Sequence, residues 1–213
     1  MNRLRVTAVR AVRDAPLTTL WLIVLFATTR IQRSASARQR RRLLHRHSTN
    51  LRHLDSEPAR VLTSSLLWLD GRRWWPYVPA YRAVLASAER RLGSWRWLLV
   101  GLAAHAVGTY VGQAHLRRAI KSASAPRRLV DARDVGVSYF LLGILGTLSG
   151  YVVRPWRSRF QAALVAGLAG NALVRPTHTE VGHLTALLVG LSCAPFVPNR
   201  DEAPWPGWPD GTG

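Results

Sequence analysis

The chain has 213 residues, of which 48% are hydrophobic, and it carries a formal net charge of +19. Soluble domains rarely combine long apolar runs with so much positive charge, whereas membrane proteins with basic loops often do. The single cysteine, Cys193, excludes an internal disulfide and a thiol-rich metal site, and it leaves the compartment open. Composition therefore favours a membrane protein.

The N-terminal part, residues 1–14, is basic and leads into an apolar run that starts at residue 15. A signal peptide is the alternative interpretation of this run. However, Arg30 and Arg33 separate it from the small residues 34–37, and more apolar segments follow. We therefore expect a retained membrane span.

Six segments could cross or enter a bilayer, for which an upright helix needs roughly 20 apolar residues. The fourth has no charge between Val135 and Val153, whereas Pro76, Pro79 and Arg82 interrupt the second. We predict an all-α, multi-pass membrane protein whose membrane domain covers 15–197. Its expected spans are 15–31, 74–91, 95–114, 135–153, 159–174 and 180–197.

The first loop, residues 32–73, is densely basic in its first half and rich in apolar and aromatic residues in its second. We expect a solvated loop along the membrane surface, drawn to anionic lipid. Nucleic acid is the weaker alternative, because no stacking or groove-reading module accompanies the basic run, and no nucleic-acid partner is expected. The tail, 198–213, is rich in Pro and Gly with two Trp, and we expect it to be flexible or to lie at the interface.

Ser138 is expected in the first turn of the fourth span, just after the charged stretch 131–134. The start of a helix offers unpaired backbone N–H groups that could stabilise an oxyanion beside a nucleophile. Gly136, two residues earlier, allows a close backbone approach there. The alternative is a serine that packs or caps a membrane helix.

His183 lies near the start of the sixth span, and two crossings separate that span from the fourth. Ser138 and His183 are therefore expected at similar depth on the same side of the bilayer. A serine with a histidine base is the minimum for nucleophilic acyl transfer. A hydrogen-bonded structural histidine is the alternative.

Small residues recur at three- and four-residue intervals around both positions, which lets two helices approach closely. This pattern supports contact between the fourth and sixth spans, although any tightly packed bundle shows it. The residues expected to pack there are Gly143, Gly146, Ala186 and Gly190.

Three stretches resemble the rhomboid family of intramembrane serine proteases. "GVSYFLLGILG" (136–146) is similar to its serine motif, and "GHLTALLVG" (182–190) to its sixth-helix histidine motif. The segment ending in "ERRLGS" (89–94) resembles its second helix. The resemblance implies a six-transmembrane-helix rhomboid-like bundle in the cell membrane, with Ser138 as nucleophile and His183 as general base and acid. Its expected partner is a transmembrane protein substrate.

Loop charge and the rhomboid resemblance predict opposite membrane orientations. The loops after the first and third spans carry the most basic residues, so the positive-inside rule favours these loops in the cytoplasm. The rhomboid resemblance implies instead a cytoplasmic N-terminus and a dyad that opens to the outside. Because the order of the motifs is more specific than the charge count, we favour the latter.

The sequence departs from the family motifs at several positions. Tyr139 stands where the serine motif has Gly, which predicts a bulky group at the mouth of the site. Leu142 replaces the aromatic residue that stacks on the histidine, and Pro76 and Ala80, or near neighbours, replace the H-x-x-x-N residues that help to hold the oxyanion. These departures favour the alternative function of an inactive rhomboid-fold scaffold or chaperone that binds transmembrane segments of client proteins.

Two other histidines, His105 and His178, are further candidates for the site. His105 could point into the cavity as a substitute oxyanion donor, although a buried histidine bonded to a backbone carbonyl is the simpler interpretation. His178, Glu180 and His183 form H-x-E-x-x-H, whose helical spacing is expected to spread the side chains around the axis. No metal, cofactor or carboxylate partner of His183 is therefore predicted, which leaves a Ser–His dyad.

Overall fold

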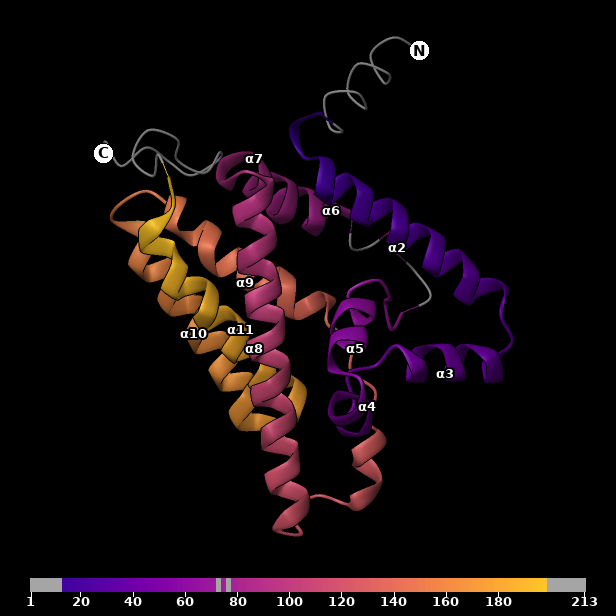
Figure 1. Ribbon diagram of the computed structural model, residues 1–213. Helices are drawn as coiled ribbons and strands as arrows, with labels where there is room; N and C mark the ends of the chain where they lie inside the picture. Colours follow the sequence, from indigo (N-terminus) through magenta and orange to yellow (C-terminus); the bar gives the residue numbers. More distant parts are fainter. Residues whose placement is uncertain (1–12, 72–73, 76–77, 199–213) are drawn as a thin grey trace.

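The computed structural model describes residues 13–71, 74–75 and 78–198, and every regular element within these ranges is helical (Figure 1). The prediction of an all-α protein is therefore confirmed. Each of the six predicted apolar segments contains a helix. These helices are α2 (Pro16–Ser34), α6 (Val78–Ala80) running through the π-helix η2 (Tyr81–Ala86) into α7 (Ser87–Leu92), α8 (Ser94–Lys121), α9 (Val137–Leu148), α10 (Trp156–Val174) and α11 (His178–Cys193).

The described residues also form three short 3₁₀ helices: η3 (Arg127–Asp131), η4 (Ser149–Tyr151) and η5 (Ala194–Phe196). In the described part of the chain, no helix combines the length and the apolarity expected of a membrane-crossing helix. The terminal segments 1–12 and 199–213, and Pro76 in the second predicted span, lie outside the described residues.

Residues 32–73, expected as a solvated loop, contain three further helices: α3 (Ala37–Arg46), α4 (Leu51–Ser56) and α5 (Pro58–Ser65). α3 begins at a capping box, in which Ser36 and Gln39 bond each other's backbone N–H groups. α4 begins at Asn50, whose side chain accepts a hydrogen bond from the N–H of His53. Leucines of α3 and α4 are buried, so this segment folds onto the helical body instead of running free in solvent.

The start of α2 is bound to the end of α7 through a buried carboxylate. Glu89, which is 2% exposed, accepts hydrogen bonds from the N–H groups of Leu17 (2.9 Å) and Thr18 (2.8 Å). The Ser94 hydroxyl donates to the same carboxylate at 2.7 Å. Gly93 between them has φ +78°, a left-handed conformation that favours glycine, and it turns the chain from α7 into α8. The "ERRLGS" stretch thus ties three helices together.

An aromatic core joins α2 to the bundle. The Trp21 ring lies 4.8 Å from the Phe140 ring, 5.9 Å from the Tyr81 ring and 6.0 Å from the Trp97 ring, all edge-to-face. Its indole N–H donates to the Leu66 carbonyl at 2.6 Å. Side chains from α2, η2, α8 and α9 therefore meet at one tryptophan.

α8 runs along the length of the molecule and packs against both α9 and α11 (Figure 1). α10 packs on α11, and none of its residues is buried. A smaller cluster of buried residues, Ala104, Tyr139 and Ala186, lies where α8, α9 and α11 meet. Both residues of the predicted dyad lie on these packed helices.

Candidate active site

Ser138 is the second residue of α9, and contacts around Gly136 fix its position. Gly136 precedes the helix, and its N–H donates to the Ser65 carbonyl at 3.3 Å. A Cβ atom at Gly136 would lie 1.9 Å from Cε1 of the His105 ring. The glycine is therefore required for close approach to a side chain, because any larger residue would displace His105 or the start of α9.

Ser138 and His183 face each other across the starts of α9 and α11. The Ser138 Oγ and His183 Nε2 atoms are 2.8 Å apart, and both side chains are partly buried. This distance lies within the range expected of a nucleophile and its base. Two residues 45 positions apart in the sequence are thus brought into hydrogen-bond contact.

Small residues allow α8, α9 and α11 to pack backbone to backbone. A Cβ atom at Gly190 would lie 2.0 Å from the Gly143 carbonyl oxygen, and one at Gly146 would lie 2.7 Å from the Leu187 carbonyl oxygen. A Cβ atom at Gly143 would meet the Ala104 methyl group at 2.1 Å, with the Ala186 carbonyl oxygen at 3.5 Å. The four residues predicted to pack here therefore lie at the α9–α11 contact.

Tyr139 does not lie at the mouth of the site, contrary to the expectation from sequence. It is 0% exposed and points between α8 and α11, where its ring centroid is 5.1 Å from that of His183. Its hydroxyl donates to Asp134 Oδ2 at 2.7 Å. Leu142 packs against the same cluster. The aromatic contact with the histidine is thus made from the position next to the serine.

His105 also differs from one of its two interpretations. Its Nε2 lies 3.0 Å from the Leu62 carbonyl oxygen and 3.3 Å from Ser65 Oγ, and the residue is 1% exposed. It stacks on Tyr139 at 6.1 Å between centroids and does not line the cavity beside Ser138. His105 is therefore a packed histidine bonded to a backbone carbonyl, not a group directed at the serine.

A cavity of about 240 Å³ lies beside Ser138. Since a water molecule takes up about 30 Å³ in the liquid, this space can hold several. Arg133 and Asp70 form an ion pair on its wall, with Nη1 and Oδ1 3.7 Å apart. Ala80 is exposed on α6 and does not line the cavity. The lining residues are Leu44, Asp70, Arg133, Asp134, Val135, Ser138 and Thr179.

The backbone at the start of α9 can supply hydrogen-bond donors to this site. The helix begins at Val137 without a side-chain cap. The Phe140 N–H donates a hydrogen bond to the Gly136 carbonyl. The N–H groups of the residues that precede Phe140 in the first turn, including the N–H of Ser138, lie ahead of this bond. Such N–H groups carry the positive end of the helix dipole and suit a developing negative charge.

A sequence model of the family described as "Rhomboid-like protein" matches residues 10–203, which is most of the chain. The chain belongs to this family. Rhomboid family proteins are membrane proteins, which supports a membrane location. No curated protein and no solved structure matches the chain.

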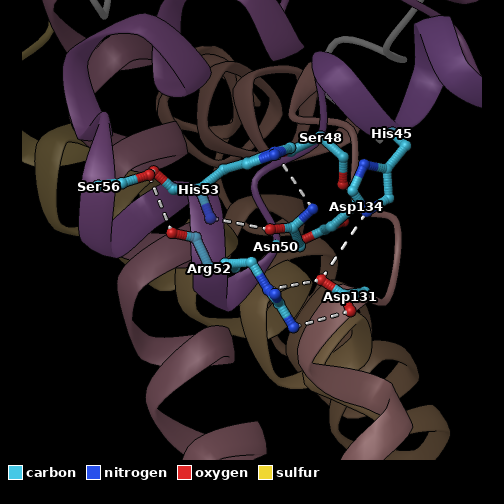
Figure 2. Close-up of polar contacts among 8 residues, drawn as sticks. All are labelled: His45, Ser48, Asn50, Arg52, His53, Ser56, Asp131 and Asp134. Atoms are coloured by element: carbon cyan, nitrogen blue, oxygen red, sulfur yellow. Dashed lines mark hydrogen bonds and ion pairs between the residues drawn. The ribbon is translucent and has the colours of Figure 1, made fainter.

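In this rhomboid-like protein, the end of α3 and the start of α4 hold the segment that leads into α9 (Figure 2). The Ser48 hydroxyl accepts from the Asp134 N–H at 2.7 Å, and the Thr49 N–H donates to the Asp134 carbonyl at 3.0 Å. Arg52 Nε lies 3.1 Å from Asp131 Oδ1. We call these contacts between 48–52 and 131–134 the loop clasp. It was not predicted, although the buried polar residues Ser48 and Thr49 supply its contacts with Asp134.

The other ring nitrogen of His183 faces a carboxylate. This contact was not predicted from the sequence. Glu180 Oε2 lies 3.5 Å from His183 Nδ1, one helical turn away on α11. The i, i+3 spacing therefore brings these two side chains together, while His178 contributes to a different pocket. Among the described residues, no group of three His, Cys, Asp or Glu side chains is arranged to hold a metal ion.

Proposed function

We propose that this rhomboid-like protein is an intramembrane serine protease in which Ser138 and His183 form the reactive pair. The observation that carries the proposal is the 2.8 Å separation between Ser138 Oγ and His183 Nε2. The resemblance of 136–146 and 182–190 to the family's serine and histidine motifs supports it. A partly buried, hydrogen-bonded Ser and His near the starts of two packed helices are more than a binding scaffold requires.

The proposed reaction follows the chemistry of acyl transfer. Ser138 Oγ attacks the carbonyl carbon of the scissile peptide bond while His183 Nε2 takes the hydroxyl proton. The C–N bond then breaks, and His183 returns that proton to the leaving amine nitrogen, which leaves an acyl ester on Ser138. A water molecule, deprotonated by His183, hydrolyses the ester and regenerates the serine. The cavity beside Ser138 can supply this water.

Backbone N–H groups at the start of α9 are the proposed oxyanion donors. The family's H-x-x-x-N side chains are missing from the sequence, and neither His105 nor Ala80 lines the cavity. Loss of one oxyanion donor lowers the rate of a serine protease by about 10²–10³-fold. We therefore expect a slow enzyme.

The proposed substrate is a membrane-anchored protein, and the proposed location is the cell membrane with several crossings. The support is the family and the apolar segments of the sequence. Alkaline carbonate extraction of expressing cells tests the location. Release of the intact protein into the supernatant would contradict it.

A second candidate function is a rhomboid-fold scaffold that binds transmembrane segments of client proteins without cutting them. The missing H-x-x-x-N side chains favour it. It differs from the protease in one respect that can be measured, which is the nucleophilicity of Ser138.

The deciding experiment is labelling of the detergent-purified protein with a fluorophosphonate probe. Wild type is expected to label, and Ser138→Ala and His183→Ala are each expected to abolish labelling while their thermal midpoints stay close to wild type. Ser192→Ala, which removes an exposed hydroxyl on α11, is the matched control and should label fully. A folded wild-type protein that does not label would overturn the protease in favour of the scaffold.

A further inference from the structure

We infer that Glu180 is a positioning residue that holds His183 in the form needed to accept the serine proton. This inference rests on the proposed function, and it extends the Ser–His pair to a Ser–His–Glu arrangement. The two nitrogens of the His183 ring face different partners: Nε2 faces Ser138 Oγ at 2.8 Å, and Nδ1 faces Glu180 Oε2 at 3.5 Å. The ring therefore lies between a hydroxyl and a carboxylate.

The carboxylate is itself held in place. The Thr177 hydroxyl accepts from the Glu180 N–H at 3.3 Å and caps the first turn of α11. Asn171 of α10 donates its side-chain N–H to Glu180 Oε2 at 2.5 Å. The Glu180 and His183 side chains are 21% and 18% exposed. The cap thus fixes the backbone of Glu180 within α11, and Asn171 of α10 holds its partly buried carboxylate.

The arrangement favours one tautomer of the imidazole. A neutral imidazole carries its proton on one nitrogen only, and a carboxylate beside Nδ1 favours Nδ1–H. The Nε2 lone pair is then free to accept the Ser138 proton. When the proton arrives, the imidazolium stands next to a negative charge. Among the described residues, the ion-pair partner of Glu180 is His183.

The role of Glu180 is separable from folding. Glu180→Gln keeps the size and the contact with Asn171 but removes the charge, and Glu180→Asp keeps the charge. Ser192→Ala, which removes an exposed hydroxyl elsewhere on α11, serves as the matched control. A carboxylate buried behind the histidine of a serine protease is worth about 10⁴-fold in rate, and the longer, partly exposed contact here predicts about 10–10²-fold.

Two measurements test the inference, one through activity and one without it. The first is the rate of fluorophosphonate labelling for wild type, Glu180→Gln, Glu180→Asp and Ser192→Ala, with thermal midpoints as the check on folding. We expect Glu180→Gln to label about 10–10²-fold more slowly, Glu180→Asp to recover part of the rate, and Ser192→Ala to label at the wild-type rate.

The second measurement is the ¹⁵N NMR spectrum of histidine-labelled protein, with His183→Ala used to assign the signals. In wild type, the neutral ring is expected to carry its proton on Nδ1, and Glu180→Gln should shift the signals toward a mixture of tautomers.

The outcomes separate the two proposals. If wild type labels but Glu180→Gln changes neither rate nor tautomer, Glu180 has no positioning role and the dyad stands alone. If wild type does not label but the tautomer depends on Glu180, the protease is overturned and the orientation of His183 by Glu180 stands. If there is neither labelling nor tautomer dependence, both are overturned.

Discussion

Asp134 connects His183 to the first loop. Its backbone is held by Ser48 and Thr49, and its carboxylate accepts from the Tyr139 hydroxyl, whose ring contacts His183. Burial raises the pKa of Asp134 to about 6 from an ordinary 3.8, although hydrogen bonds, that from Tyr139 foremost, oppose this rise. A change in the protonation of the Asp134 carboxyl therefore affects both the loop clasp and the contacts around His183.

The raised pKa predicts a pH-dependent stability. Because the folded-state pKa exceeds the unfolded one, the stabilisation from Asp134 is complete below about pH 3.8 and is lost as the pH rises through about 6. The loss is on the order of 1–3 kcal/mol. Asp134→Asn keeps the acceptor for Tyr139 and removes the titration.

Thermal midpoints from about pH 4 to about pH 7 check this. The wild-type midpoint should fall relative to that of Asp134→Asn as the pH rises, and parallel curves for the two proteins would contradict the prediction. Comparing the two proteins cancels the titration of the histidines, which both share.

At the scale of single residues, the sequence predicted which residues lie at the candidate site better than it predicted where their side chains point. Ser138 and His183 could be found because each stands in a recognisable local motif near a helix start. The side on which Tyr139 projects, and the approach of Glu180 to His183, depend on how α9 and α11 are rotated about their axes. That rotation is set by packing between helices, which no local pattern records.

At the scale of elements, the contact between α9 and α11 depends on the absence of side chains. Gly190→Ala would place a methyl group 2.0 Å from the Gly143 carbonyl oxygen and force the helices apart. Overpacking of this kind costs about 1–3 kcal/mol, and here it would also lengthen the distance between Ser138 and His183. We expect a lower thermal midpoint and slower fluorophosphonate labelling.

Gly167→Ala on α10 is the matched control, because a Cβ atom there meets nothing within 4 Å. It should be neutral or slightly stabilising, since alanine favours helix more than glycine does. If Gly190→Ala behaved like Gly167→Ala, the close α9–α11 contact would be wrong.

The six apolar segments predicted the six longest helical stretches, but their ends were less predictable. α8 continues to Lys121, beyond the expected end at 114, because charged residues that leave an apolar pattern still favour helix. The helices in 32–73 escaped prediction since the basic composition suggested solvent. Their start signals were nevertheless present, as the Ser36–Gln39 capping box, Asn50 and Pro58.

At the scale of the whole molecule, the first loop and the helical bundle form one body around the site. The loop clasp holds 131–134, the Gly136 N–H donates to the end of α5, and Trp21 of α2 bonds Leu66 just beyond it. These contacts join residues 45 to 86 positions apart in the chain. Long-range pairing of polar backbone groups has no signature in composition or periodicity, so this part of the architecture could be obtained only from the structure.

The Glu89 contact with the start of α2 sets an order of events during synthesis. Its acceptor atoms stand 71 and 72 residues after the N–H groups that they bind, so the ribosome releases the first helix long before its cap exists. Until Glu89 emerges, those N–H groups must bind water or another acceptor. The first helix can therefore reach its final position only after the segment carrying α7 has been synthesised.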